Sequence, residues 1–122
     1  MKKVSLLTIH FGANFGSNLQ TIATVEMLKR HGCKTRVVDY IPARYTWKRF
    51  FRRGLRSATS VLKLPLLLFV EAANRYIYHS FLSRHVTFSR PIHAEDDFAA
   101  VCPKADVYVT GSDQVWNSLH NE

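Results

Sequence analysis

The first forty residues carry the pattern that most constrains the fold. Val4–Ile9 is almost continuously apolar, which is typical of a strand covered on both faces in a parallel sheet. A glycine-containing turn over residues 11–18 follows, and then a helical pattern over Leu19–His31 that Gly32 ends. Thr35–Tyr40 has the composition of a second strand. These segments predict one βαβ unit with a right-handed crossover.

The turn between the first strand and the helix is a candidate ligand site. Gly12 and Gly16 would let the backbone approach a ligand closely, and a helix N-terminus offers unpaired N–H groups to an anion. Ser17 and Asn18 are the predicted N-cap candidates of the helix. A plain tight turn in which Asn14 makes local backbone hydrogen bonds explains the same residues equally well, so both interpretations stay open.

A long insertion separates the second and third strands. The third candidate strand, Asp106–Thr110, begins more than sixty residues after Tyr40, whereas an ordinary crossover is far shorter. Thr46–Leu82 has a helical pattern interrupted at Pro65. Because 122 residues suit a single domain, we expect an α/β fold with a parallel sheet and a helical insertion over about residues 44–88.

The insertion is strongly basic. The chain has a formal net charge of +8, and no acidic residue occurs between Ile41 and Glu71. Seven basic residues lie in this region: Arg44, Lys48, Arg49, Arg52, Arg53, Arg56 and Lys63. Three interpretations follow: a solvated insertion whose aromatic residues cap the sheet, a segment that docks on an anionic glycan or membrane surface, or a nucleic-acid contact. No nucleic-acid-binding motif supports specific recognition of the last kind.

Metal binding and membrane spanning find no support in the sequence. Cys33 and Cys102 are far apart and lack the spacing of a zinc site. The strongest apolar run, Leu64–Val70, contains Pro65 and is much shorter than the roughly 20 residues that a spanning helix needs. We therefore expect a cytoplasmic protein, with peripheral contact at the inner face of the cell membrane as the remaining membrane hypothesis.

A second polar cluster, Gly111–Asn117, directly follows the third strand. In parallel sheets the carboxyl ends of the strands share one edge, so this cluster is expected to face the first turn. Its hydroxyl, carboxylate, amide and indole groups suit a polar ligand such as a sugar. The alternative is a structural turn in which Asp113 caps a helix and Trp116 fills the core.

Together these segments resemble a known family, the polysaccharide pyruvyl transferases. The likeness extends from Met1 to Asn117, but only to the N-terminal portion of that family. It is carried by the residues Asn14-Phe15-Gly16-Ser17, Leu19-Gln20, Gly32, Val38-Asp39-Tyr40-Ile41-Pro42 and Gly111-Ser112-Asp113-Gln114-Val115-Trp116-Asn117.

The resemblance implies a Rossmann-like lobe of a two-lobed architecture similar to glycosyltransferase B, with residues 1–122 as one partial lobe. It implies a transferase of surface or exopolysaccharide biosynthesis that moves pyruvate from phosphoenolpyruvate to sugar hydroxyls as a ketal. Phosphoenolpyruvate is then a co-substrate, no further cofactor is expected, and the partners are a saccharide acceptor and a second lobe. Because one lobe lacks half of the substrate-positioning groups, we expect this fragment to be inactive alone.

The resemblance also implies site residues. The family pattern assigns Asn14, Gly16, Ser17 and Gln20 to substrate binding from the first turn, and Gly111, Ser112, Gln114, Trp116 and Asn117 from the end of the third strand. Asp113 is the catalytic candidate, to orient a sugar hydroxyl or to act as a base. The competing hypothesis is a non-catalytic module whose basic segment docks an anionic glycan or membrane. In either case the edge of a three-stranded sheet offers a surface for homo-oligomer formation.

Overall fold

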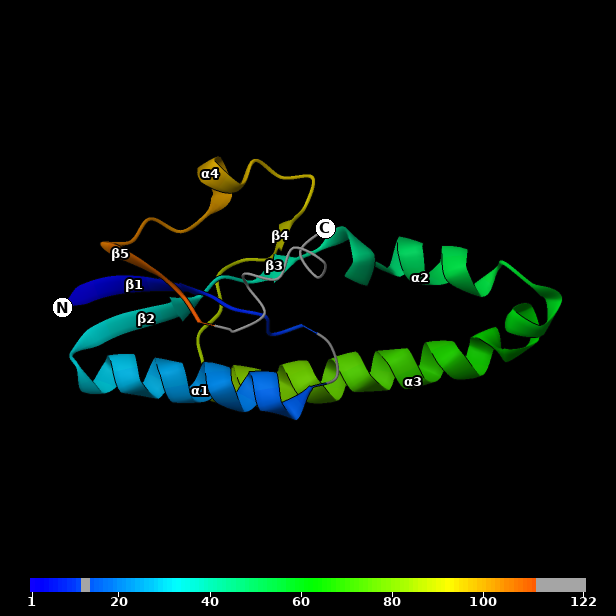
Figure 1. The fold of residues 1–122 in the computed structure, drawn as a ribbon, viewed down its shortest axis with the longest axis horizontal. Helices are drawn as coiled ribbons and strands as arrows, with labels where there is room; N and C mark the ends of the chain where they lie inside the picture. Colours follow the sequence, from blue (N-terminus) through cyan, green and yellow to red (C-terminus); the bar gives the residue numbers. More distant parts are fainter. Residues whose placement is uncertain (12–13, 112–122) are drawn as a thin grey trace.

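The computed structural model describes residues 1–11 and 14–111 and has a mixed α/β fold. Figure 1 shows its arrangement, with a small sheet above two long helices and a helical hairpin extending to one side. In chain order the elements are β1 (Lys2–Leu7), α1 (Phe15–Arg30), β2 (Cys33–Val37), β3 (Tyr40–Ile41), the short 3₁₀ helix η1 (Ala43–Tyr45), α2 (Trp47–Gly54), α3 (Ala58–Ser83), β4 (Ile92–His93), α4 (Phe98–Val101) and β5 (Val107–Thr110).

The main sheet is parallel, with the order β2-β1-β5. The prediction of a parallel βαβ unit from the first forty residues is confirmed, although β1 lies two residues earlier than the apolar run suggested. Leu6 is fully buried at the centre, where the register places it between Val37 and Val109. A second, two-stranded parallel sheet joins β3 to β4.

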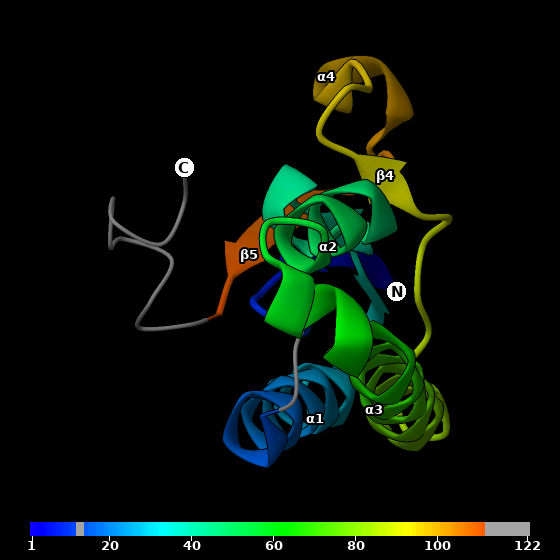
Figure 2. The ribbon, with the colours of Figure 1, turned by 90° about the vertical axis from the view of Figure 1, so that its right-hand side faces the viewer.

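The core lies between the sheet and the helices α1 and α3. Its buried residues are Leu6, Val25, Val37, Leu82 and Val86. Figures 1 and 2 show α1 and α3 side by side on one face of the sheet. Side chains alternate along a strand, so Ser5 points to the other face, where its hydroxyl donates to the carbonyl of Pro103.

Asn14, not Ser17 or Asn18, caps α1. Its Oδ1 accepts hydrogen bonds from the backbone N–H groups of Gly16 at 2.9 Å and Ser17 at 3.3 Å. The helix therefore starts four residues earlier than its apolar pattern indicated, because a cap is set by local geometry and not by hydrophobic periodicity. Gly32, with a φ of +74°, ends the helix as predicted.

The insertion forms an antiparallel helical hairpin. The prediction of an interruption at Pro65 is wrong: Pro65 lies inside α3, and the break falls at residues 55–57. Ser57 starts α3 by accepting a hydrogen bond from the N–H of Ser60. Gly54 allows the close approach of α2 to α3, since an added Cβ would collide with Leu64. Figure 1 shows the hairpin extending well past the sheet and α1.

The two ends of the insertion meet at β2. The N–H of Val37 donates to the carbonyl of Thr87, and the N–H of Ser89 donates to the carbonyl of Val37, each at 2.8 Å. The chain thus returns to the strand that it left fifty residues earlier. Among the helices in the described part of the chain, none has the length and apolarity needed to cross a bilayer.

Candidate functional site

A cavity of about 580 Å³ lies between α3 and the carboxyl ends of β1 and β2. This volume is within the range of small-molecule sites, and the carboxyl edge is where open parallel sheets bind ligands. Its walls come from both the sheet and the insertion. They include His10, Phe11, Asp39, Ile41, Tyr45, Glu71, Asn74, Arg75, Tyr78 and His79.

His10 and Asp39 form a buried pair at the sheet side of the cavity. His10 Nε2 lies 2.9 Å from Asp39 Oδ1, and the two side chains are 4% and 11% exposed. His10 Nδ1 lies 3.1 Å from the carbonyl oxygen of Thr8. A carbonyl oxygen only accepts, so a hydrogen bond at this distance requires the proton on Nδ1. The contact to Asp39 then contains one shared proton, as imidazolium with carboxylate or as imidazole with carboxylic acid.

The pair is held from several directions. The N–H of Asp39 donates to Ser89 Oγ at 3.0 Å, and its carbonyl accepts from the N–H of Ile92 at 2.8 Å. The ring of His10 packs against Phe88, with centroids 5.2 Å apart. The returning end of the insertion therefore fixes the position of both partners, as preorganised acid–base chemistry requires.

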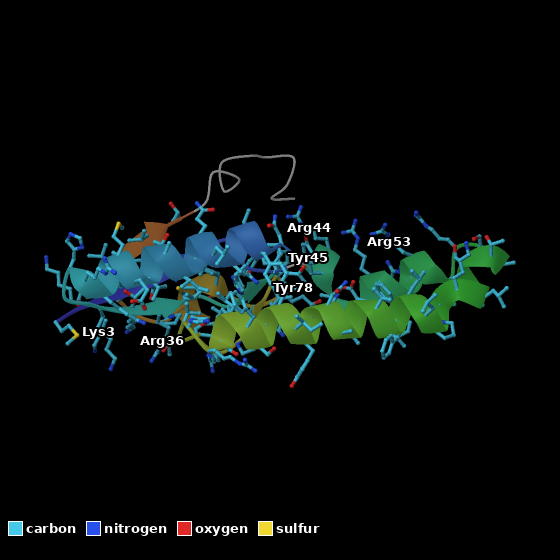
Figure 3. All side chains as sticks on the ribbon, turned by 90° about the horizontal axis from the view of Figure 1, so that it is seen from below. Lys3, Arg36, Arg44, Tyr45, Arg53 and Tyr78 are labelled. Carbon is cyan, nitrogen blue, oxygen red and sulfur yellow. The ribbon has the colours of Figure 1, made fainter. Side chains whose placement is uncertain are left out.

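Aromatic rings form a second wall. The ring centroids of Phe11 and Tyr45 are 4.6 Å apart, and Tyr78 lines the same cavity from α3. Figure 3 labels Tyr45, which precedes α2, and Tyr78 of α3. Arg75, the cavity's cation from α3, donates to Glu71 at 2.8 Å and lies over the ring of Trp47. Apolar ring faces beside amide and hydroxyl groups suit a polyhydroxylated ligand such as a sugar.

The predicted residues of the first turn lie at the start of α1, next to this cavity. Asn14, Gly16 and Ser17 take part in the N-cap, so two of the N–H groups expected to face a ligand already have an acceptor. The side chain of Gln20 is exposed. None of these four lines the cavity, but the ring of Phe15 packs on that of cavity residue Tyr78, with centroids 4.5 Å apart.

Gly111 lies where the sequence placed it, at the edge shared with the first turn. Its N–H donates to the carbonyl of Leu7, and its own carbonyl accepts from Thr8 Oγ1 at 2.9 Å. A Cβ at this position would lie only 3.1 Å from a methyl carbon of Leu6, which explains the glycine. The remaining predicted residues, Ser112, Asp113, Gln114, Trp116 and Asn117, lie outside the described residues.

Sequence reasoning missed the pair and the α3 wall. His10 and Asp39 had a usable signal, since each is a polar residue directly after an apolar strand segment. No sequence signal pointed to Tyr78 or Arg75, because their position depends on how α3 returns to the sheet. Asn18 was taken only as a cap candidate, but its amide is buried with no hydrogen-bond partner among residues 1–11 and 14–111.

Other chemistries find less support in the described residues. No three His, Cys, Asp or Glu side chains within residues 1–11 and 14–111 are arranged to hold a metal ion. Burial raises the pKa of the Cys102 thiol, which lowers its thiolate fraction and its nucleophilicity. Comparisons with protein-family models, curated proteins and solved structures gave no match to this chain.

The proton on His10 provides the first test of the pair. We expect long-range ¹H–¹⁵N NMR spectra to show a protonated Nδ1, because the Thr8 carbonyl accepts its hydrogen bond. Asp39→Asn should leave Nδ1 protonated while changing the chemical shift of Nε2. A neutral ring protonated only at Nε2 in the unsubstituted protein would contradict the geometry.

Asn14 provides a test of the helix cap. Asn14→Ala should lower the free energy of unfolding by about 1 kcal/mol, because the N–H groups of Gly16 and Ser17 lose their acceptor. Asn14→Asp should keep most of that stability, since aspartate is an equally good cap. Urea unfolding followed by circular dichroism measures both. An alanine variant as stable as the unsubstituted protein would show that the cap is energetically unimportant.

Proposed function

We propose that this chain is the N-terminal lobe of a polysaccharide pyruvyl transferase-like protein and that its cavity binds the saccharide acceptor. The observation that carries the proposal is the His10–Asp39 pair beside an aromatic wall, at the carboxyl edge of a parallel sheet. Gly111 lies at the same edge, since its N–H donates to the carbonyl of Leu7 at the end of β1.

The pair matches what ketal formation requires. Phosphoenolpyruvate must gain a proton on its methylene carbon, while a sugar hydroxyl oxygen bonds to the adjacent carbon and loses its proton. A second hydroxyl then displaces phosphate and closes the ketal, so the two hydroxyl protons end on the new methyl group and on phosphate. The shared proton of His10 and Asp39 is a candidate donor, and Asp113 is a candidate base.

Phosphoenolpyruvate needs groups beyond the described cavity. Its phosphate and carboxylate call for cations or N–H donors, but Arg75 is already paired with Glu71. A second lobe facing this edge would supply them. Positioning of two substrates accounts for about 7 to 11 kcal/mol of a barrier, so the isolated lobe is expected to bind an acceptor without transferring pyruvate at a useful rate.

The basic face of α2 favours a second candidate, a non-catalytic module that docks an anionic glycan or membrane. Trp47 and Gly54 pack toward α3, whereas Lys48, Arg49, Arg52 and Arg53 are exposed. Figure 3 shows Arg53 on the outer side of the hairpin. A helix face with four cations attracts an anionic surface at low salt.

The acceptor proposal is tested by saccharide binding. We expect uncharged oligosaccharides to shift the NMR signals of cavity residues and to bind at least ten-fold more weakly to Tyr45→Ala, which removes part of the aromatic wall. Tyr108→Ala is the matched control, since Tyr108 lies outside this cavity. Equal loss in both variants, or no shift with any saccharide at millimolar concentration, would count against an acceptor site.

The docking candidate is tested by cosedimentation with vesicles containing about 30% anionic lipid and, in parallel, by binding to an acidic polysaccharide. The pair Arg52→Glu and Arg53→Glu should abolish salt-sensitive binding. The pair Lys34→Glu and Arg36→Glu changes the net charge equally on exposed positions of β2 and should retain it. The same loss in both pairs would mean that net charge, and not the α2 face, governs the attraction.

A further inference from the structure

The outer face of α3 is strongly apolar and exposed. Leu62, Leu66, Phe69 and Tyr76 are 84%, 66%, 72% and 75% exposed, and Ile77 and Val70 are about half exposed. Isolated exposed apolar residues are ordinary, but a contiguous apolar patch on a folded protein marks an interaction surface. We call these six residues the α3 stripe.

The stripe has the spacing of a helix-pairing surface. Residues 62, 66, 69, 73 and 76 are separated by steps of four and three, which keeps them on one face of the helix. Ala73 is the small member of this series. Of the charged residues of α3, Glu71 and Arg75 pair with each other in the wall of the cavity, and Lys63 is exposed at the edge of the stripe beside Val70.

Nothing in the described part of the chain covers this face. The opposite side of α3 makes the internal contacts: Leu64 faces Gly54 of α2, Arg75 reaches Trp47, and Leu82 is in the core. Figure 1 shows that the N-terminal half of α3 extends past α1 and the sheet, with α2 as its neighbour. A further helix can therefore lie along it without meeting the sheet.

We propose that the α3 stripe pairs antiparallel with the α3 stripe of a second copy of this chain, about a two-fold axis near Phe69. The stripe is self-complementary about that residue. Phe69 of one copy then faces Phe69 of the other, Leu62 faces Tyr76, and Leu66 faces the small residue Ala72, next to Ala73. A two-fold axis requires such matching of a surface with itself, and the alternation of large and small residues lets the helices interlock.

The surface area of the α3 stripe is close to what a dimer of this chain needs. Its two aromatic side chains alone can bury about 150 to 250 Å² each, and four aliphatic side chains add to that. A stable interface takes roughly 800 Å² from each partner, which the stripe and its flanking residues approach.

A bilayer suits the stripe less well than a second copy. Interfacial helices carry many basic residues beside their apolar face, whereas Lys63 is the only exposed lysine or arginine of α3, and the exposed cations of α2 lie on the side of the hairpin turned away from the stripe. The pairing does not depend on the proposed transferase function.

Sedimentation equilibrium tests the pairing on the full chain. The unsubstituted protein should be a dimer at micromolar concentration, and the pair Leu66→Glu and Phe69→Glu should be monomeric with an unchanged circular dichroism spectrum. The control pair Leu19→Glu and Met27→Glu, on the exposed side of α1, should remain dimeric. A monomer up to about 100 μM, or equal dissociation of both pairs, would overturn the proposal.

Cysteine cross-linking tests the geometry, after Cys33→Ser and Cys102→Ser remove the natural thiols. Phe69→Cys should form a disulfide-linked dimer on mild oxidation. Leu62→Cys should not link to itself but should link to Tyr76→Cys when the two variants are mixed. Efficient linkage of Leu62→Cys to itself would indicate parallel helices and overturn the antiparallel axis. Loss of neutral-vesicle binding with the stripe variants, in a protein that stays monomeric, would assign the stripe to lipid instead.

Discussion

The closure of the insertion on β2 is the interaction on which the rest of the structure depends. The hydrogen bonds of Val37 with Thr87 and Ser89 join residues fifty positions apart. Closing a flexible loop of that length costs about 3.5 kcal/mol in chain entropy beyond a constant term. Two hydrogen bonds alone do not offset this cost, since each contributes only about 1 kcal/mol net. The burial of Leu82 and Val86 against Leu6 and Val37 supplies the remainder.

The same closure creates the candidate site. Asp39 is held by Ser89 and Ile92, which both follow the insertion, and His10 packs on Phe88 from the same segment. The pair is buried because the returning chain covers it, and a buried acid–base pair interacts more strongly than one in water. A substitution that loosens the return of α3 would therefore act on the site without touching it.

The sequence predicted what local patterns determine and failed where tertiary contacts decide. The parallel strands, the end of α1 at Gly32 and the place of Gly111 followed from apolar runs and glycine chemistry. The cap at Asn14 was misplaced because Gly16, Ser17 and Asn18 interrupt the apolar pattern, although Phe15 lies four residues before Leu19 and continues it. Pro65 did not break α3, because it is exposed and the carbonyl that it leaves unpaired can be solvated. The α3 wall of the cavity needed the return path of the chain, which no local pattern encodes.

One inserted hairpin presents three surfaces of different chemistry. The cavity side of α3 carries Arg75 and Tyr78, the outer side of α2 is cationic, and the far side of α3 is apolar. The cationic side is separate from the other two, whereas Tyr76 belongs both to the cavity wall and to the apolar side. Burial of the apolar side against a second copy would cover Tyr76 at the edge of the cavity and leave the cations in water. Attraction to anions is therefore separable from self-association, whereas Tyr76 couples self-association to ligand binding at the cavity. Substitutions at Leu62, Leu66 or Phe69, which do not line the cavity, report on self-association alone.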